Sequence, residues 1–227
     1  MNFSIDSNIL VALVNPKDRL NDKSSTLMET RRDNQLILCT SVLKESQTIF
    51  RNKINQIIVE IIQFLPNFQD KKVNQMEYQE QLILAFKKIK TSNPGTSNFL
   101  DLVYNEIIVF LENNDSLKLP SFLSQLAIRY AQTLYIKIEK MHPNGNVIHL
   151  NHDNLEIIKK ATSETYFKDP NDERIFYELM TNLPDIKPVE FLTGDKEFAK
   201  KIDESYPNCI EYFGYGENSF FCTLVKG

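Results

Sequence analysis

A strand-like run ends in an aspartate near each end of the chain, and this pair of features constrains the fold more than any other. Near the start, Asn2-Phe3-Ser4-Ile5 leads into Asp6; near the end, the run from 188 to 192 leads through Thr193-Gly194 into Asp195. In an α/β protein, acids at the carboxyl ends of strands project into the crevice where ligands bind. Two such acids close together would bind a divalent cation.

Hydrophobic periodicity between these two runs predicts an α/β domain that is interrupted by helices. The apolar run 35–39 predicts a buried strand, and Thr40-Ser41 can cap the long amphipathic helix that follows it. Strand, helix and strand in this order indicate a parallel sheet. From 66 to 152 the periodicity is helical, so we expect a discontinuous α/β domain over 1–65 and 153–227 and an all-helical insertion or lid over 66–152.

The other elements of the α/β part follow from capping and turn signals. Asp169-Pro170 is expected to open a helix that runs through Met180, because proline and acids both favour the first turn. We further expect helices over Ile9–Val14, Ser24–Arg32 and Lys196–Asp203 and short strands over Cys209–Phe213 and Phe220–Val225.

Composition excludes several classes of protein. No apolar run approaches the roughly 20 residues that span a bilayer, and no secretory signal opens the chain, so we expect a cytoplasmic protein with no membrane partner. The net charge of -4 is not that of a generic nucleic-acid binder, although a cluster of catalytic acids would contribute to it. Phosphate-loop, dinucleotide and nucleophile-elbow motifs are missing from the sequence, and we expect no organic cofactor.

Cysteine and histidine patterns also argue against a thiolate or zinc site. The chain has 3 cysteines with no C-x-x-C pair, and the apolar runs around Cys39 and Cys222 predict buried packing residues. His149-x-x-His152 imitates half of a zinc site, but no third ligand stands at a known spacing. We therefore interpret these histidines, with His142, as loop residues.

Four acids occupy comparable positions in the predicted α/β elements. Asp6 follows the first strand, Glu45 lies one helical turn past Ser41, Asp172 stands at the start of a late helix, and Asp195 follows the next strand. Hard cations such as Mg²⁺ and Mn²⁺ prefer oxygen ligands and bind through a few carboxylates together with water and phosphate. The sequence therefore predicts a site for Mg²⁺ or Mn²⁺ made by these four residues.

The order of these motifs resembles the PIN-domain family of metal-dependent nucleases. The matching segments are Ile5-Asp6-Ser7-Asn8, Thr40-Ser41-Val42-Leu43-Lys44-Glu45, Asn171-Asp172-Glu173-Arg174-Ile175 and Phe191-Leu192-Thr193-Gly194-Asp195-Lys196-Glu197-Phe198. The resemblance covers roughly the first 60 and the last 75 residues, and it leaves the helical middle unexplained. Small toxin nucleases of the family are generally shorter than this chain.

The resemblance implies a three-layer α/β sandwich around a central parallel sheet and hydrolysis of RNA phosphodiester bonds with Mg²⁺ or Mn²⁺. Asp6, Glu45, Asp172 and Asp195 would be the catalytic and metal-binding residues. Ser7, Asn8 and Thr193 would orient them through hydrogen bonds, and Asp169 would add to the site or substitute for Asp172. RNA is the expected partner; a homodimer stays open, and an antitoxin-like partner is not indicated by the sequence.

Three alternatives remain at the level of the sequence. Asp6, Asp172 and Asp195 all precede helices, where aspartate is a favoured cap, and for Asp172 alone capping is the better interpretation. The chain could be a catalytically degenerate member of the same fold that binds RNA or mediates assembly. A haloacid-dehalogenase-type phosphatase also begins with a strand-borne aspartate, but it has a second aspartate where this chain has Asn8.

Overall fold

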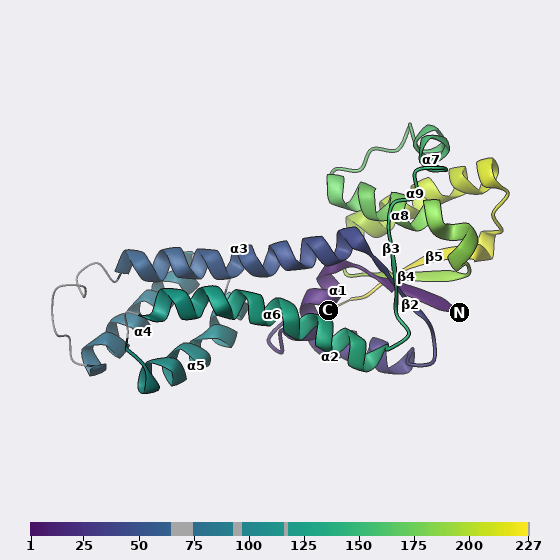
Figure 1. The fold of residues 1–227 in the computed structure, drawn as a ribbon. Helices are drawn as coiled ribbons and strands as arrows, with labels where there is room; N and C mark the ends of the chain where they lie inside the picture. Colours follow the sequence, from purple (N-terminus) through teal and green to yellow (C-terminus); the bar gives the residue numbers. More distant parts are fainter. Residues whose placement is uncertain (65–74, 93–96, 116–117, 227) are drawn as a thin grey trace. The chain divides into compact units, whose positions relative to one another are not determined.

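The computed structural model describes residues 1–64, 75–92, 97–115 and 118–226. The chain forms two compact units (Figure 1). The first comprises Met1–Val14, Arg19–Gln47 and Leu134–Gly227, and the second comprises Asn15–Asp18 and Thr48–Thr133. Two of the boundaries fall inside long helices, α3 (Thr40–Phe64) and α6 (Leu119–Met141), and the other two fall in the loop that contains Asn15–Asp18.

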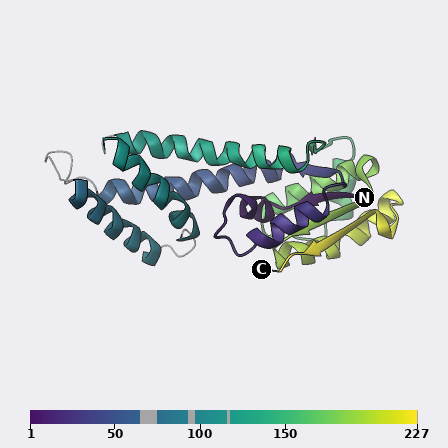
Figure 2. The same ribbon diagram turned by 90° about the horizontal axis from the view of Figure 1, so that it is seen from below.

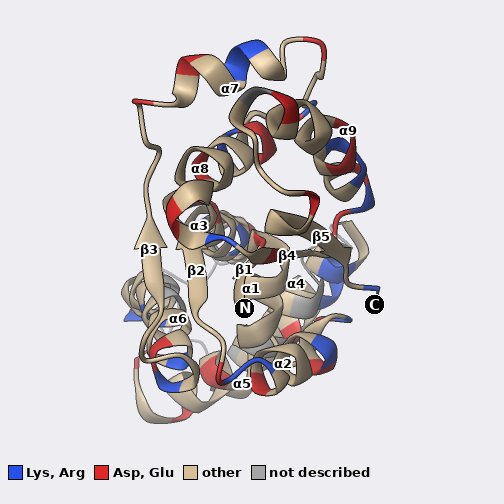
Figure 3. Cartoon of the chain, turned by 90° about the vertical axis from the view of Figure 1, so that its right-hand side faces the viewer, with Lys and Arg blue, Asp and Glu red and all other residues tan. Residues whose placement is uncertain are grey.

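The first unit is an α/β fold around a parallel sheet of five strands. In sequence order the strands are β1 (Asn2–Ile5), β2 (Leu36–Cys39), β3 (Asn146–Ile148), β4 (Val189–Thr193) and β5 (Phe220–Leu224). Their order across the sheet is β3-β2-β1-β4-β5, and every neighbouring pair is parallel (Figure 3). Residues of β2 and β4 are buried throughout, as expected for a parallel sheet that is covered on both faces.

Helices cover both faces of this sheet (Figure 1). On one face lie α7 (Leu155–Ala161), α8 (Pro170–Ile186) and α9 (Lys196–Phe213), and on the other lie α1 (Ser7–Val14) and α2 (Asn21–Thr30). Phe191 of β4 and Phe198 of α9 pack edge to face, with ring centroids 5.5 Å apart. The expectation of an α/β fold with a central parallel sheet is confirmed.

Apart from Asn15–Asp18, the described part of the second unit is mainly helical and contains later turns of α3, the first turns of α6, and α4 (Gln75–Ser92) and α5 (Ser97–Asn113) (Figure 2). Aromatic side chains hold its helices together: Phe50 packs on Phe99 and Phe86 on Tyr104, with centroids 5.6 and 5.2 Å apart. Of the helices in the described residues, none has both the length and the apolar character that crossing a membrane requires.

Four local predictions are wrong. Cys209–Phe213 is not a strand but the last part of α9, which continues past Pro207 because its apolar stripe stays buried as far as Cys209. Helix α8 likewise continues past Met180 to Ile186, with Pro184 inside it. Helix α2 begins at Asn21 and not at Ser24, which is a buried residue inside the helix.

The fourth error lies in the segment from 66 to 152, because β3 falls within it and extends the sheet at β2. Its register pairs Leu38 with Val147 and Cys39 with Ile148. Three residues are too few to produce a readable alternation of apolar and polar side chains. Since β3 belongs to the sheet, the α/β unit includes residues upstream of 153.

Candidate functional site

The strand order has a topological switch point between β1 and β4. The chain adds β2 and β3 on one side of β1 and then crosses to add β4 and β5 on the other side. At such a topological switch point, the loops that leave the carboxyl ends of two neighbouring strands diverge and open a ligand site. Asp6 directly follows β1, and Thr193-Gly194-Asp195 stands at the end of β4.

Asp6 is buried, and both oxygens of its carboxyl group accept hydrogen bonds. The side chain is 3% exposed. Oδ1 accepts from the Ser7 amide at 2.7 Å, and Oδ2 accepts from Asn8 Nδ2 and Thr193 Oγ1, each at 2.6 Å. Burial raises the pKa of Asp6 to about 6, with a further contribution from the charge of Asp195, although the three hydrogen bonds oppose the shift.

Thr193 and Asn8 connect the ends of the two strands. The Thr193 hydroxyl donates to Asp6 and accepts from the amide of Asp195 at 3.0 Å. Asn8 donates to Asp6, and its Oδ1 accepts from the amide of Gly194 at 2.9 Å. A Cβ at position 194 would lie 2.8 Å from Leu20 Cδ1 and 3.1 Å from Asn8 Oδ1, so a larger residue there would displace the side chain of Leu20 or Asn8.

Two of the aspartates at helix starts, Asp195 and Asp169, are caps, and Asp172 is not. Asp195 caps α9, because its Oδ1 accepts from the amides of Glu197 and Phe198 at 2.7 and 3.0 Å. Asp169 caps α8 by accepting from the Asn171 amide at 2.8 Å, with Pro170 in the first turn. Asp172 stands inside the first turn of α8, so the interpretation of Asp172 as a cap is wrong and Asp169 has that role.

Glu45 of α3 and Asp172 of α8 belong to the same electrostatic cluster as Asp6. Burial raises the pKa of Asp172 to about 7, and the charges of Asp6, Asp169, Asp195 and Glu45 add to the shift. Burial and then the charge of Asp6 raise the pKa of Glu45 to about 6, while a hydrogen bond from the Ser7 side chain lowers it. The fold thus brings acids from four separate segments within range of mutual repulsion.

The donor set suits a hard divalent cation, since it consists of carboxylate oxygens. Oε2 of Glu45 is buried without a hydrogen-bond partner, so a carboxylate oxygen is left for another ligand. In the part of the chain that the structure describes, no three acidic, histidine or cysteine side chains have the spacing of ready-made metal ligands. The acids are therefore close enough to repel one another but are not preassembled around a single point.

Glu178 is a functional candidate that the sequence did not reveal. It lies in the middle of α8, is 1% exposed, and accepts hydrogen bonds from the backbone and hydroxyl of Ser41 at the start of α3. In the sequence it stands among ordinary helix residues, and a single glutamate in a helix is usually solvated. Only its contact with a segment more than one hundred residues away distinguishes it.

His142 and His149 have contacts with residues other than the four acids. His142 lies in the loop that follows α6, as expected, but it is buried: its Nε2 lies 3.2 Å from the Met28 carbonyl, and its ring packs edge to face on Phe3. Burial lowers its pKa. His149 is exposed, with Nδ1 2.8 Å from the hydroxyl of Thr40.

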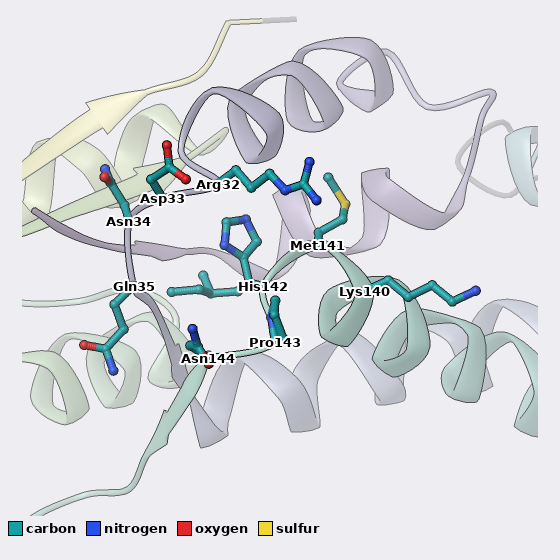
Figure 4. A pocket seen from close by; sticks show the side chains of 10 residues that line it. Arg32, Asp33, Asn34, Gln35, Lys140, Met141, His142, Pro143 and Asn144 are labelled. Carbon is teal, nitrogen blue, oxygen red and sulfur yellow. The ribbon is translucent and has the colours of Figure 1, made fainter.

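A pocket of about 440 Å³ lies at the opposite end of the sheet, where the chain enters β2 (Figure 4). Arg32, Asp33 and Lys140 are among its lining residues, but the Lys140 side chain points away from the buried His142 in Figure 4. Its polar groups do not converge, so this pocket is a weaker candidate than the acidic cluster.

Searches against family models, curated proteins and solved structures find no match to the chain.

Proposed function

We propose that the chain is a PIN-like, metal-dependent endoribonuclease that hydrolyses RNA phosphodiester bonds at the acidic cluster. The observation that carries this proposal is that Asp6, Glu45 and Asp195 all lie within electrostatic range of Asp172, with Asp6 and Asp195 at the switch point between β1 and β4. The PIN-like identity rests on the four motifs and on the parallel sheet that supports them. Both the cation and the RNA substrate are part of the proposal.

In this function the four acids would hold Mg²⁺ or Mn²⁺. Oδ2 of Asp195 takes no part in capping α9, and Oε2 of Glu45 has no hydrogen-bond partner, so these oxygens suit the role of ligands. When bound, the cation lowers the pKa of a water molecule and neutralises charge that develops on the phosphate. Ser7, Asn8 and Thr193 keep the Asp6 carboxylate in one orientation through their hydrogen bonds.

A second candidate, an RNA-binding or assembly module without turnover, is favoured by the bonding of the strand-end aspartates. Both oxygens of Asp6 are engaged within the protein, and Asp195 stabilises the start of α9. A phosphatase with Asp6 as nucleophile has less support. That reaction needs an accessible carboxylate oxygen, and the side chain of Asp6 is 3% exposed.

Cleavage of single-stranded RNA with Mn²⁺ or Mg²⁺, followed by gel electrophoresis, tests the proposal. Asp195→Asn is the sharpest variant, because asparagine caps a helix as well as aspartate does but lacks the charge. We expect this change to reduce cleavage at least about 100-fold, the scale of losing one electrostatic catalytic group, with the fold intact. Asp33→Asn, an exposed acid at the other end of the sheet, should cleave like the wild type.

Four outcomes would contradict the proposal. Cleavage that persists in EDTA would show that the reaction needs no metal. Full activity in Asp195→Asn would show that it does not depend on the acidic cluster. RNA binding without turnover by the wild-type chain would favour the binding module. Hydrolysis of a small phosphomonoester, lost in Asp6→Asn, would favour the phosphatase.

A further inference from the structure

Glu178 joins two helices of the α/β unit that each carry an acid of the cluster. Its Oε1 accepts from Ser41 Oγ at 2.7 Å, and its Oε2 accepts from the Ser41 amide at 3.0 Å. Both partners lie at the start of α3, while Glu178 belongs to α8. Figure 3 shows α3 and α8 beside each other, both with acidic segments.

The chemistry of this contact explains why a carboxylate is buried there. The first N–H groups of a helix have no partner within the helix, and the positive end of the helix dipole favours a negative charge. Glu178 satisfies one of these amides and the Ser41 hydroxyl together. Its nearest cation, Arg174 Nε, lies 3.8 Å from Oε1 and is 56% exposed, so the hydrogen bonds to Ser41 are the closer contacts.

The position of the contact relates it to the acidic cluster. Ser41 and Glu45 are four residues apart on α3 and therefore lie on one face of the helix, one turn apart. Asp172 precedes Glu178 by six residues on α8. Since the charge of Glu45 contributes to the raised pKa of Asp172, the two acids lie within electrostatic range across the junction that Glu178 and Ser41 hold together.

We propose that Glu178 is a positioning residue for the metal site: its hydrogen bonds to Ser41 hold the start of α3 against α8 and so set the separation of Glu45 and Asp172. This inference rests on the proposed function. Glu178 is not a metal ligand in it, and it touches neither the cation nor the substrate. Loss of the contact should weaken metal binding more than it weakens the fold.

Mn²⁺ binding by isothermal titration calorimetry, together with thermal denaturation of the same proteins, tests this inference. We expect Glu178→Gln to raise the Kd for Mn²⁺ about 10-fold or more, the usual effect of removing a residue that orients metal ligands. Ser41→Ala, which keeps the charge of Glu178 but removes one hydrogen bond, should change the Kd in the same direction and by less.

The matched control is Glu190→Gln. Glu190 is also a buried acid, 6% exposed, but its carboxylate bonds Arg31 at 2.8 and 3.0 Å and Thr223 at 2.9 Å, away from α3 and α8. This variant should lower the melting temperature and leave the Kd for Mn²⁺ within about 2-fold of wild type, well below the 10-fold effect of a ligand-orienting residue. Equal loss of Mn²⁺ affinity in both glutamine variants, or unchanged affinity in Glu178→Gln, would overturn the inference.

A metal-free measurement separates failure of this inference from failure of the proposed function. If the wild-type chain bound no Mn²⁺, the proposed nuclease would fail, and Glu178 would lose its role at a metal site. Amide hydrogen exchange in the first turn of α3 would still show whether Glu178 holds the helix start. Faster exchange in Glu178→Gln, with no change in Glu190→Gln, would mean that the contact exists and that the acidic cluster is what fails to bind the metal. If Mn²⁺ binds and exchange is equal in all three proteins, the inference alone is wrong.

Discussion

At the scale of single residues, Thr193 shows how a strand end controls a carboxylate. Its hydroxyl has one proton, which goes to Asp6, and its oxygen accepts the amide of Asp195. One small side chain therefore bonds both the acid that follows β1 and the loop that follows β4. The hydrogen bond also lowers the pKa of Asp6, opposing the burial that raises it.

Thr193→Val should remove these effects with little change of shape. We expect the pKa of Asp6 to rise above its value of about 6, since a stabilising donor to the carboxylate is lost, and Mn²⁺ affinity to fall about 10-fold. Carboxyl chemical shifts during a pH titration and calorimetry would measure the two changes. The control is Thr162→Val, which loses a buried hydroxyl bonded to Ile158 in α7. In this variant the pKa of Asp6 and the Mn²⁺ affinity should stay as in the wild type. If the two valine variants behave alike, Thr193 has no special role.

At the scale of elements, the start of α8 contains two aspartates with opposite effects on stability. Asp169 caps the helix and accepts the amide of Asn171, whereas Asp172 lies inside the first turn with its pKa raised to about 7 by burial and by neighbouring acids. At pH 8 without metal, Asp169→Ala should destabilise the protein by about 1 kcal/mol. Asp172→Asn should stabilise it, because it removes a charge that its surroundings repel.

Thermal denaturation of both variants in EDTA would check these signs. Asp169→Asn is the control, since asparagine retains the cap and should keep nearly the wild-type melting temperature. Destabilisation by Asp172→Asn would mean that its carboxylate is paired in the metal-free protein rather than repelled.

The same elements show which parts of the structure the sequence could predict. The strands before Asp6 and Asp195 and the Asp169-Pro170 helix start depend on local patterns, and the structure has them where they were expected. Pro207 is a local signal too, but burial of Phe198, Ile202 and Cys209 along one stripe outweighs it and α9 continues. Glu178 has no local signal, because its role depends on a contact with Ser41 that only the folded chain creates.

At the scale of the whole molecule, the acidic cluster should make the stability of the metal-free protein depend on pH. The pKa values of Asp6, Glu45 and Asp172 are about 6, 6 and 7 in the folded chain, above their ordinary values of 3.8, 4.5 and 3.8. The folded state therefore binds more protons than the unfolded state between about pH 4 and 7, and the free energy of unfolding falls as the pH rises through this window. His142, whose pKa is lowered, acts in the opposite direction below about pH 6.5.

We expect the three acids to outweigh the single histidine, so that in EDTA the protein melts about 5 °C higher at pH 5.5 than at pH 8, equivalent to about 2 kcal/mol for a chain of this size. Mn²⁺ at about 100 times its Kd should restore about 2.7 kcal/mol at pH 8, because it binds the deprotonated acids of the folded state. Calorimetric scans at both pH values, with and without Mn²⁺, measure both effects.

Asp33→Asn should reproduce the wild-type dependence of the melting temperature on pH. Asp172→Asn should flatten this dependence, since it removes the acid with the most raised pKa. A melting temperature that neither falls with pH nor responds to Mn²⁺ would show that the acids do not share one crevice, which would contradict the proposed site as a whole.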